Sequence, residues 1–380
     1  MRQRTVVTVV AVAAILAAIM LAGCGGVTRL GQVGTASFVG SDTCRGCHPA
    51  EDADVHDSGH PFKLNKVESG QPPTYPFSSV PNTPAGYSWN DVSYVIGGYG
   101  WKARFIDLDG YIVTGNAVQY NLATQQWAAY HSGDPPGTKP YTCGACHTTG
   151  WVATGAGGPH QDGLPGMHGT FSEPGITCEA CHGPGSRHVQ TLQASDITVD
   201  IRAERCGECH FRDSQHRIEA SGGFIRHHEQ YDEMIADGNT VPGHQDQECV
   251  DCHHPHRGSR YAGDFGLVRT CESCHPSEAA SLDHSPGPEC KDCHMPRATK
   301  SAVKVHDHEG DVRTHIFEIN TAAVDKSAMW YVDGTKTFSH GFVTLDFACY
   351  GCHDDQSGVG GGNSQKTLAE LSAAAIGIHN

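Results

Sequence analysis

The chain has few of the side chains that build an ordinary hydrophobic core. Of its 380 residues only 38% are apolar and 8% aromatic, whereas 46 are glycine and 20 are proline. This apolar share is below that of a typical globular chain. So much glycine and proline favours short elements joined by many turns. We therefore expect something other than side chains to fill much of the interior.

Basic residues are also scarce. The chain carries 26 Lys and Arg against 42 Asp and Glu, a formal charge of −16, which argues against nucleic acid as a partner. It lacks a Walker loop, a dinucleotide fingerprint, a G-x-S-x-G elbow and an H-E-x-x-H motif, so no flavin or nicotinamide chemistry is indicated. An acidic, glycine-rich chain could be disordered, but the strict spacing of its cysteines argues against that.

The N-terminus has the pattern of an export signal. Arg2 and Arg4 precede an apolar stretch from Val6 to Leu21, which is shorter than the about 20 residues of a membrane span. The next residues, Leu21-Ala-Gly-Cys24, resemble the lipobox of bacterial lipoproteins. That resemblance implies cleavage before Cys24 and a lipid on its thiol, and Gly25 mildly favours the outer membrane. The alternative is ordinary signal cleavage that leaves Cys24 as a free thiol.

The other 16 cysteines form eight C-x-x-C pairs, and a histidine follows each pair directly. C-x-x-C-H is the attachment signature of c-type haem, in which two thiols form thioethers and the imidazole binds the iron. Zinc ribbons, disulfide scaffolds and thioredoxin-like sites do not require that histidine. The sequence therefore predicts eight covalently bound haems c, whose flat apolar rings replace the missing core. The predicted thioether cysteines are Cys44, Cys47, Cys143, Cys146, Cys178, Cys181, Cys206, Cys209, Cys249, Cys252, Cys271, Cys274, Cys290, Cys293, Cys349 and Cys352. The predicted proximal iron ligands are His48, His147, His182, His210, His253, His275, His294 and His353.

Histidine is also the best candidate for the second axial ligand of each iron. Eighteen histidines remain outside the motifs, whereas the mature chain keeps only four methionines. Bis-histidine ligation implies lower reduction potentials than His/Met ligation.

Several segments around the motifs resemble a known multihaem superfamily. It contains hydroxylamine oxidoreductase, its tetrahaem electron acceptor, pentahaem nitrite reductase and octahaem tetrathionate reductase. The similar segments are Phe38–Thr43 with Asp57–His60, Cys178–His188, Phe224–Tyr231, Cys249–His256, and Cys290–Pro296 followed by Gly310–His315. In that superfamily a Ser-x-His after the first haem commonly supplies a distal ligand, which here implies His60. The segment CEACHGPGSRH likewise implies His188.

Eight distal ligands are expected from these resemblances and from position in the chain. His244 and His284 lie shortly before a motif, where a turn can direct an imidazole to a neighbouring haem, and His379 lies on an expected helix over 366–379. The eight candidates are His60, His188, His228, His244, His256, His284, His315 and His379. The leading substitutes are His131, His216 and His340.

We expect a multihaem cytochrome c of mostly irregular loops and short α-helices wrapped around stacked haems. A small β-hairpin subdomain near the N-terminus is indicated by the alternating stretch from Trp101 to Leu108 and the Asp109-Gly110 turn. That subdomain could be a docking surface or a spacer covering the first haem. The expected parts are a signal peptide (1–23), a flexible tether (24–40), a first haem segment (41–60), a β-rich subdomain (61–140), a compact array of six motifs (141–300), and a C-terminal haem segment with a helix (301–380).

All eight motifs end in histidine, and none has the C-x-x-C-K form that often marks a catalytic haem in related enzymes. We therefore expect an electron carrier of the bacterial cell envelope with no catalytic residue of its own. Its partners would be redox proteins or a terminal acceptor and, through the lipid, the membrane; a homo-oligomer or filament is compatible with this role. The alternative is an oxidoreductase that acts on a small nitrogen or sulfur compound at one open haem.

Overall fold

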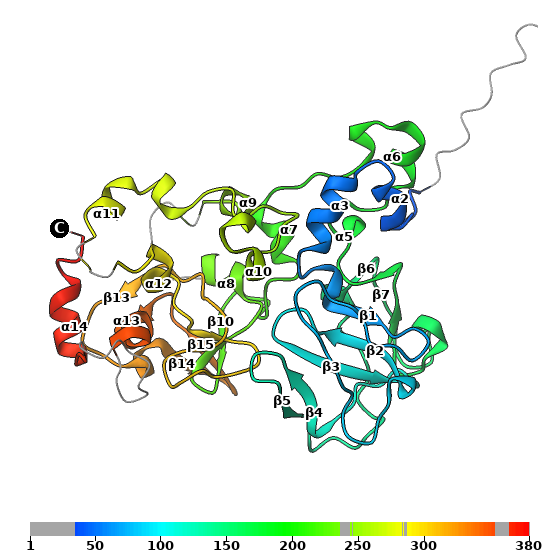
Figure 1. The fold of residues 1–380 in the computed structure, drawn as a ribbon, viewed down its shortest axis with the longest axis horizontal. Coiled ribbons are helices and arrows are strands. Elements are labelled where there is room, and N and C mark those ends of the chain that lie inside the picture. Colours follow the sequence, from blue (N-terminus) through cyan, green and yellow to red (C-terminus); the bar gives the residue numbers. More distant parts are fainter. Residues whose placement is uncertain are drawn as a thin grey trace, which may run out of the picture.

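The computed structural model describes residues 35–235, 244, 246–282, 284, 287–353 and 365–379. The predicted signal peptide, Cys24 and most of the tether lie outside these residues. The described chain forms two β-sheets along one side and a series of short helices along the other (Figure 1).

The first sheet is an antiparallel meander in strand order β1-β2-β3-β4-β5. Its strands are β1 (Leu64–Lys66), β2 (Val92–Gly97), β3 (Lys102–Asp107), β4 (Gly115–Asn121) and β5 (Gln126–Tyr130). Side chains of β3 alternate, so Ala103 and Phe105 enter one core cluster while Ile106 enters another. Lys102 and Arg104 therefore share the face of Ile106. All five strands fall within the stretch predicted to be β-rich, which forms a full sheet instead of an isolated hairpin.

The second sheet was not expected from the sequence. Its order is β12-β11-β10-β15-β14. The strands are β10 (Ile218–Ser221), β11 (Phe224–Arg226), β12 (Thr299–Lys300), β14 (Trp330–Asp333) and β15 (Lys336–Ser339). Ile218, Phe224 and Ile225 pack with Ile316 and Phe347 in its core. The sequence did not indicate this sheet, because strands of two to four residues are too short to show an alternating pattern.

The remaining strands are short pairs, β6 (Thr148–Thr149) with β9 (Glu173–Pro174), β7 (Val152–Ala153) with β8 (Gly169–Thr170), and β13 (Ile319–Asn320) with β16 (Val343–Thr344). The single turns of 3-10 helix are η1 (Pro61–Lys63), η2 (Trp89–Asp91), η3 (Gln161–Gly163), η4 (Ala194–Asp196), η5 (Gly263–Gly266) and η7 (Lys326–Met329).

Eight helical segments carry the motifs: α2 (Ser41–Arg45), α4 (Gly144–His147), α5 (Cys178–His182), α7 (Ala203–Gly207), α9 (Cys249–Cys252), η6 (Cys271–Ser273), α12 (Cys290–His294) and α13 (Leu345–His353). The other helices are α3 (Pro49–His56), α6 (Ser186–Thr191), α8 (Gln230–Ile235), α10 (Ser259–Ala262), α11 (Pro276–Ala280) and α14 (Leu368–Ala375). No helix in the described part of the chain is both long and apolar enough to cross a membrane.

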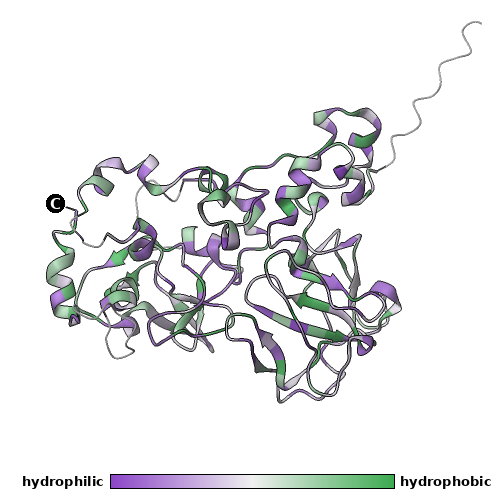
Figure 2. Ribbon diagram, viewed as in Figure 1, coloured by the Kyte–Doolittle hydropathy of each residue, from purple (hydrophilic) through white to green (hydrophobic). Residues whose placement is uncertain are grey.

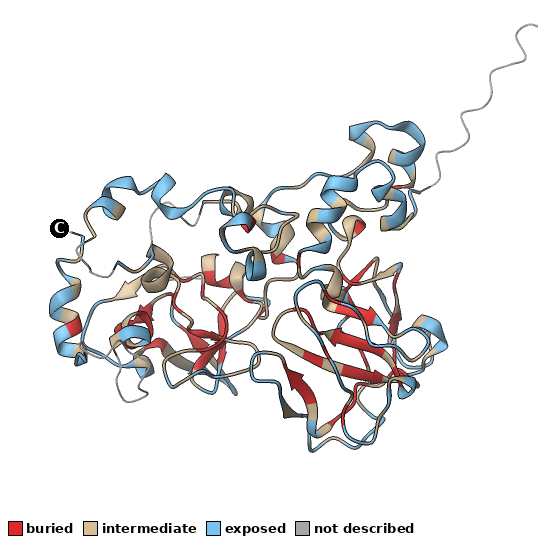
Figure 3. Cartoon of the chain, viewed as in Figure 1, coloured by how far each residue is buried: buried red, intermediate tan, exposed pale blue. Residues whose placement is uncertain are grey.

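Burial is concentrated in the two sheets, whereas most motif helices are exposed or half-buried (Figure 3). The colours along these helices are mixed, with hydrophilic and hydrophobic residues in most of them (Figure 2). Helix α13 is an exception, because it buries Leu345 and Phe347. Protein side chains therefore supply little of the packing around most of the other motifs.

Candidate haem-binding sites

Each motif is wound into one helical turn. The amide of His48 donates to the carbonyl of Cys44 at 2.9 Å, and His210 donates to Cys206 at 3.0 Å in the same way. Residues three and four positions apart lie on one side of such a turn. The turn therefore directs both thiols and the imidazole toward one side, as a c-type haem requires. We number the sites 1 to 8 in the order of their motifs, from Cys44–His48 to Cys349–His353.

The structure brings each motif histidine opposite one of the eight expected distal histidines. The ring centroids are separated by 6.3 Å for His48–His188, 6.5 Å for His147–His228, 6.1 Å for His182–His256, 6.3 Å for His210–His60, 6.0 Å for His253–His315, 5.8 Å for His275–His244, 6.1 Å for His294–His379 and 5.8 Å for His353–His284.

These separations match two imidazoles that bind one metal from opposite sides. A metal–imidazole bond is about 2 Å long, and the ring centre lies roughly 1 Å beyond the nitrogen, so two such ligands have centroids about 6 Å apart. Rings in direct stacking contact would lie closer together. The donor set at every site therefore fits an iron held between two histidines.

One distal histidine has two motif histidines nearby. The ring of His228 lies 6.5 Å from His147 and 6.2 Å from His210. His60, however, faces only His210 among the motif histidines in the described ring contacts. A one-to-one pairing therefore assigns His228 to site 2 and His60 to site 4.

Hydrogen bonds orient many of these rings. The Nδ1 atom of a motif histidine contacts a backbone carbonyl in three sites: Lys63 O at 3.1 Å for His147, Thr198 O at 2.7 Å for His182 and Phe317 O at 3.0 Å for His294. Among the distal histidines, His188 contacts Gln193 O at 2.9 Å in the same way. A carbonyl at Nδ1 fixes the tautomer whose Nε2 lone pair is free for a metal.

Burial keeps several of the rings neutral. It lowers the pKa of His60 to about 3 and the pKa of His147 and His253 to about 4, with nearby positive charges adding to the effect. Neutral imidazole is the form that binds a metal. These histidines are therefore ready to act as ligands at neutral pH.

The substitute candidates have other surroundings. His131 pairs with Asp134 at 3.0 Å, His216 with Asp232 at 2.9 Å, and His340 stacks on Phe342. Among described ring contacts none of the three faces a motif histidine. His306, in the acidic loop of 306–309, contacts Glu309 at 2.9 Å. No group of three or more His, Cys, Asp or Glu side chains in the described ranges is arranged to hold a bare metal ion.

Contacts between motif cysteines give the spatial order of the sites. The thiols of Cys44 and Cys178, of Cys206 and Cys249, and of Cys271 and Cys290 lie close enough to interact. Closely spaced thiols also link Cys181 to Cys206, Cys252 to Cys271, and Cys293 to Cys352. The sites therefore follow one another as 1-3-4-5-6-7-8. Site 2 joins this row at site 4, where the thiols of Cys146 and Cys209 lie close enough to interact.

Two carboxylates anchor the first segment to site 3. Glu179, on α5, accepts from the amides of Val39 and Gly40, at 3.0 and 2.8 Å. Glu173 accepts from the amide and hydroxyl of Ser41, both at 2.9 Å. These contacts explain why sites 1 and 3 are neighbours.

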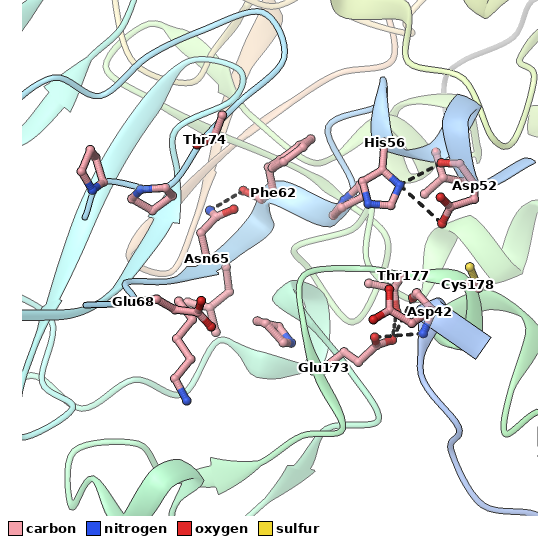
Figure 4. A pocket seen from close by; sticks show the side chains of 18 of the residues that line it. Asp42, Asp52, His56, Phe62, Asn65, Glu68, Thr74, Glu173, Thr177 and Cys178 are labelled. Atoms are coloured by element: carbon pink, nitrogen blue, oxygen red, sulfur yellow. Dashed lines mark hydrogen bonds and ion pairs between the residues drawn. The ribbon is translucent and has the colours of Figure 1, made fainter. Parts of the chain in front are cut away.

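A cleft of about 710 Å³ lies beside this anchor, between the first two helices and β1 (Figure 4). Asp42, Asp52, Glu68 and Glu173 line it, and His56 bonds to Asp52 within it. None of the sixteen paired histidines lines this cleft.

Sequence reasoning did not identify a set of cations around site 2. Lys63, Lys102 and Arg104 all lie close enough to His147 for their charges to lower its pKa. The spacing of Lys102 and Arg104 on a strand puts them on one face, a readable signal. The site they face depends on the tertiary structure and could not be read.

The fold is that of the multihaem cytochromes, and the described sites contain the thiol pairs and facing imidazoles that such proteins use. The structure is similar to an octahaem sulfite reductase, MccA, of Wolinella succinogenes, with a TM-score of 0.57 and 17% sequence identity over 83% of this chain and 65% of that one. It is also similar to the outer cell wall cytochrome OcwA, with a TM-score of 0.53 and 16% identity over 89% of this chain and 86% of that one. The chain thus spans less than two thirds of the sulfite reductase. No protein-family model matches the sequence, and no curated protein matches it.

Proposed function

We propose that this protein is an electron-transfer cytochrome with eight covalently bound haems c, each held by two thioethers and two imidazoles. The observation that carries the proposal is the set of eight facing histidine pairs, with ring centroids 5.8 to 6.5 Å apart. Haem iron with two imidazole ligands supplies reversible one-electron transfer and leaves no position open for a substrate.

The order of the sites supports the same role. The contacts between motif cysteines form a row from site 1, near the N-terminal segment, to site 8, near the C-terminal helix. Sites whose attachment cysteines lie near one another would place neighbouring cofactors close together. A donor at one end of the row and an acceptor at the other could therefore exchange electrons.

We place the protein in the cell envelope, held by a lipid on Cys24, with redox proteins or a terminal acceptor as partners. The export pattern of the N-terminus supports this location. The fold shared with an outer cell wall cytochrome also supports an exported protein. The outer membrane, a homo-oligomer and a filament are compatible with the proposal.

The test is the composition and spin state of the purified holoprotein. Its intact mass should exceed that of the lipidated polypeptide by eight haems. Low-temperature EPR should show only low-spin iron, and the reduced protein should not bind carbon monoxide rapidly. A mass increment of four haems or fewer would contradict the octahaem assignment. A stoichiometric carbon monoxide adduct would instead support an oxidoreductase acting on a small nitrogen or sulfur compound.

A further inference from the structure

Site 2 has a different position from the other seven sites. It meets the row at site 4, where Cys209 Sγ lies 3.8 Å from the carbonyl of Ala145 and close to the thiol of Cys146. Among the cysteine contacts of the described residues, this is its single connection. An electron could therefore travel from site 1 to site 8 without visiting site 2.

Site 2 is also the site around which cations gather. His147 bonds to the carbonyl of Lys63 at 3.1 Å, and Lys102 and Arg104 approach from the same face of β3. Arg212 lies near Cys146 and also near Lys102 and Arg104. Four cationic side chains from three separate segments thus lie near site 2, and one of them, Lys63, also acts on His60 and His210 of site 4.

Two of these cations have neutral hydrogen-bond partners. Lys102 Nζ donates to the carbonyl of Ser301, and Arg104 Nε donates to Gln119 Oε1 at 2.8 Å. The Arg104 guanidinium also lies 3.8 Å above the centre of the Tyr130 ring. Within the described residues neither forms an ion pair.

The remaining two cations near site 2 are Lys63 and Arg212. Arg212 Nε lies 3.6 Å from Glu229 Oε1, but burial raises the pKa of Glu229 to about 10, so its carboxyl is neutral at pH 7 and does not offset the guanidinium charge. A lysine shifts its pKa readily when it is buried. Arginine stays charged at all ordinary pH values. Of the two arginines, Arg104 is the one whose charge acts on the imidazole of His147, so it is the variant of choice at site 2.

We propose, on the basis of the electron-transfer function above, that site 2 holds the haem of highest reduction potential and stores one electron beside the seven-site row. Reduction takes one electron from the row and changes the iron from ferric to ferrous, with no bond made or broken. It removes one positive charge, so neighbouring cations favour the reduced state. Haem propionates carry negative charges that favour the ferric state. If the cations bind these propionates, they neutralise that charge, which also raises the reduction potential of the site 2 haem.

The test is a spectroscopic redox titration of the holoprotein and of two variants, Arg104→Gln and Lys102→Met. Both variants should lower the highest of the eight midpoint potentials more than the other seven. Arg104→Lys should retain most of the wild-type value. The control is Lys66→Met. Lys66 lies on β1 of the same sheet, is half exposed and pairs with Asp162. Its removal should leave all eight midpoint potentials unchanged. Equal haem content per protein in each variant shows that the fold is retained.

Three outcomes separate this proposal from the proposed function. If Arg104→Gln leaves the highest midpoint in place and moves a different one, or moves all eight equally, site 2 is not the high-potential store. If partial reduction by one electron removes an EPR signal that Arg104→Gln does not alter, the store lies elsewhere. A carbon monoxide adduct on the wild-type protein would overturn the bis-histidine electron carrier itself, whatever the midpoints show.

Discussion

The imidazole of His60 faces that of His210 across 6.3 Å, with the two ring planes at 87°, although they belong to the first and fourth motif segments. The carbonyl of His60 accepts from the amide of Ile176 at 2.9 Å, which holds the N-terminal segment against the chain that precedes site 3. Site 4 is thus completed by a residue from the start of the chain. It is also the site at which sites 2, 3 and 5 meet.

We expect His60→Ala to open the iron of site 4. One haem of eight should become high-spin or water-ligated, and the reduced variant should bind about one carbon monoxide per protein, because the opposite imidazole is lost. The control is His56→Ala, which removes a half-exposed histidine that contacts Asp52. It should leave the spectra unchanged. If His60→Ala also leaves every haem low-spin and closed, His60 is not the distal ligand of site 4.

The angles between facing rings predict two classes of low-spin EPR signal. Near-perpendicular ligand planes narrow the spacing of the iron d orbitals and give a large highest g value, whereas nearly parallel planes give an ordinary rhombic signal. Four pairs are steep, at 87° for His60–His210, 85° for His244–His275, 79° for His147–His228 and 68° for His284–His353. Four are shallower, at 29° for His48–His188 and His294–His379, 37° for His253–His315 and 43° for His182–His256.

The two classes should therefore integrate to about equal intensity in the oxidised holoprotein. Replacing a ligand of one class should remove signal from that class alone: His188→Ala from the rhombic signals, and His284→Ala from the large-g signals. A spectrum dominated by one class would show that the ligand planes differ from those in the structure.

The chemistry of each motif is easier to read from the sequence than the fold around it. A motif such as Cys178–His182 is a local unit, so its chemistry can be read from five residues. The pairing of His315 with site 5 depends on tertiary contacts, and only the resemblance to a multihaem superfamily made it a candidate. Proximity of the two rings is now established, while iron ligation stays a prediction.

The order of the sites and the second sheet could not be predicted. Cys146 and Cys209 belong to motifs that are not consecutive, and nothing in their local sequence specifies that they meet. The strands β10 and β11 are held by partners from distant segments, including β15 and β12. Their short length hides the alternation that marked β3. The expected C-terminal helix over 366–379 is present as α14, which ends earlier, at Ala375.

The N-terminal pattern makes a separate prediction about location. Cys24→Ser should release the cytochrome into the soluble fraction or block its processing, because the lipid would have no thiol to which it could be attached. Fractionation of cells and intact mass measure the result. The control is Ser41→Ala, which keeps the lipobox. A Cys24→Ser protein that is processed normally and stays in the membrane would show that Cys24 is not the lipid site.

Glu219 predicts how the second sheet responds to acid. Its side chain is 6% exposed on β10, and its carboxylate pairs with Arg226 of β11 at 2.5 Å and with Lys336 of β15. Burial raises the pKa of Glu219, but Lys336 and Arg226 outweigh burial, so its pKa lies below the ordinary value. The ion pairs therefore stabilise the fold fully above the unfolded pKa of about 4.3 and lose that effect as the pH falls through the folded pKa.

Glu219→Gln should cost about 1 kcal/mol at pH 7, a modest loss because both cations are half exposed and can be hydrated. The difference in Tm between wild type and variant should shrink as the pH falls below 4.3. Asp307→Asn, which breaks an exposed pair with Lys304, should change Tm at neither pH, and a Glu219→Gln deficit that grows in acid would contradict the assigned sign.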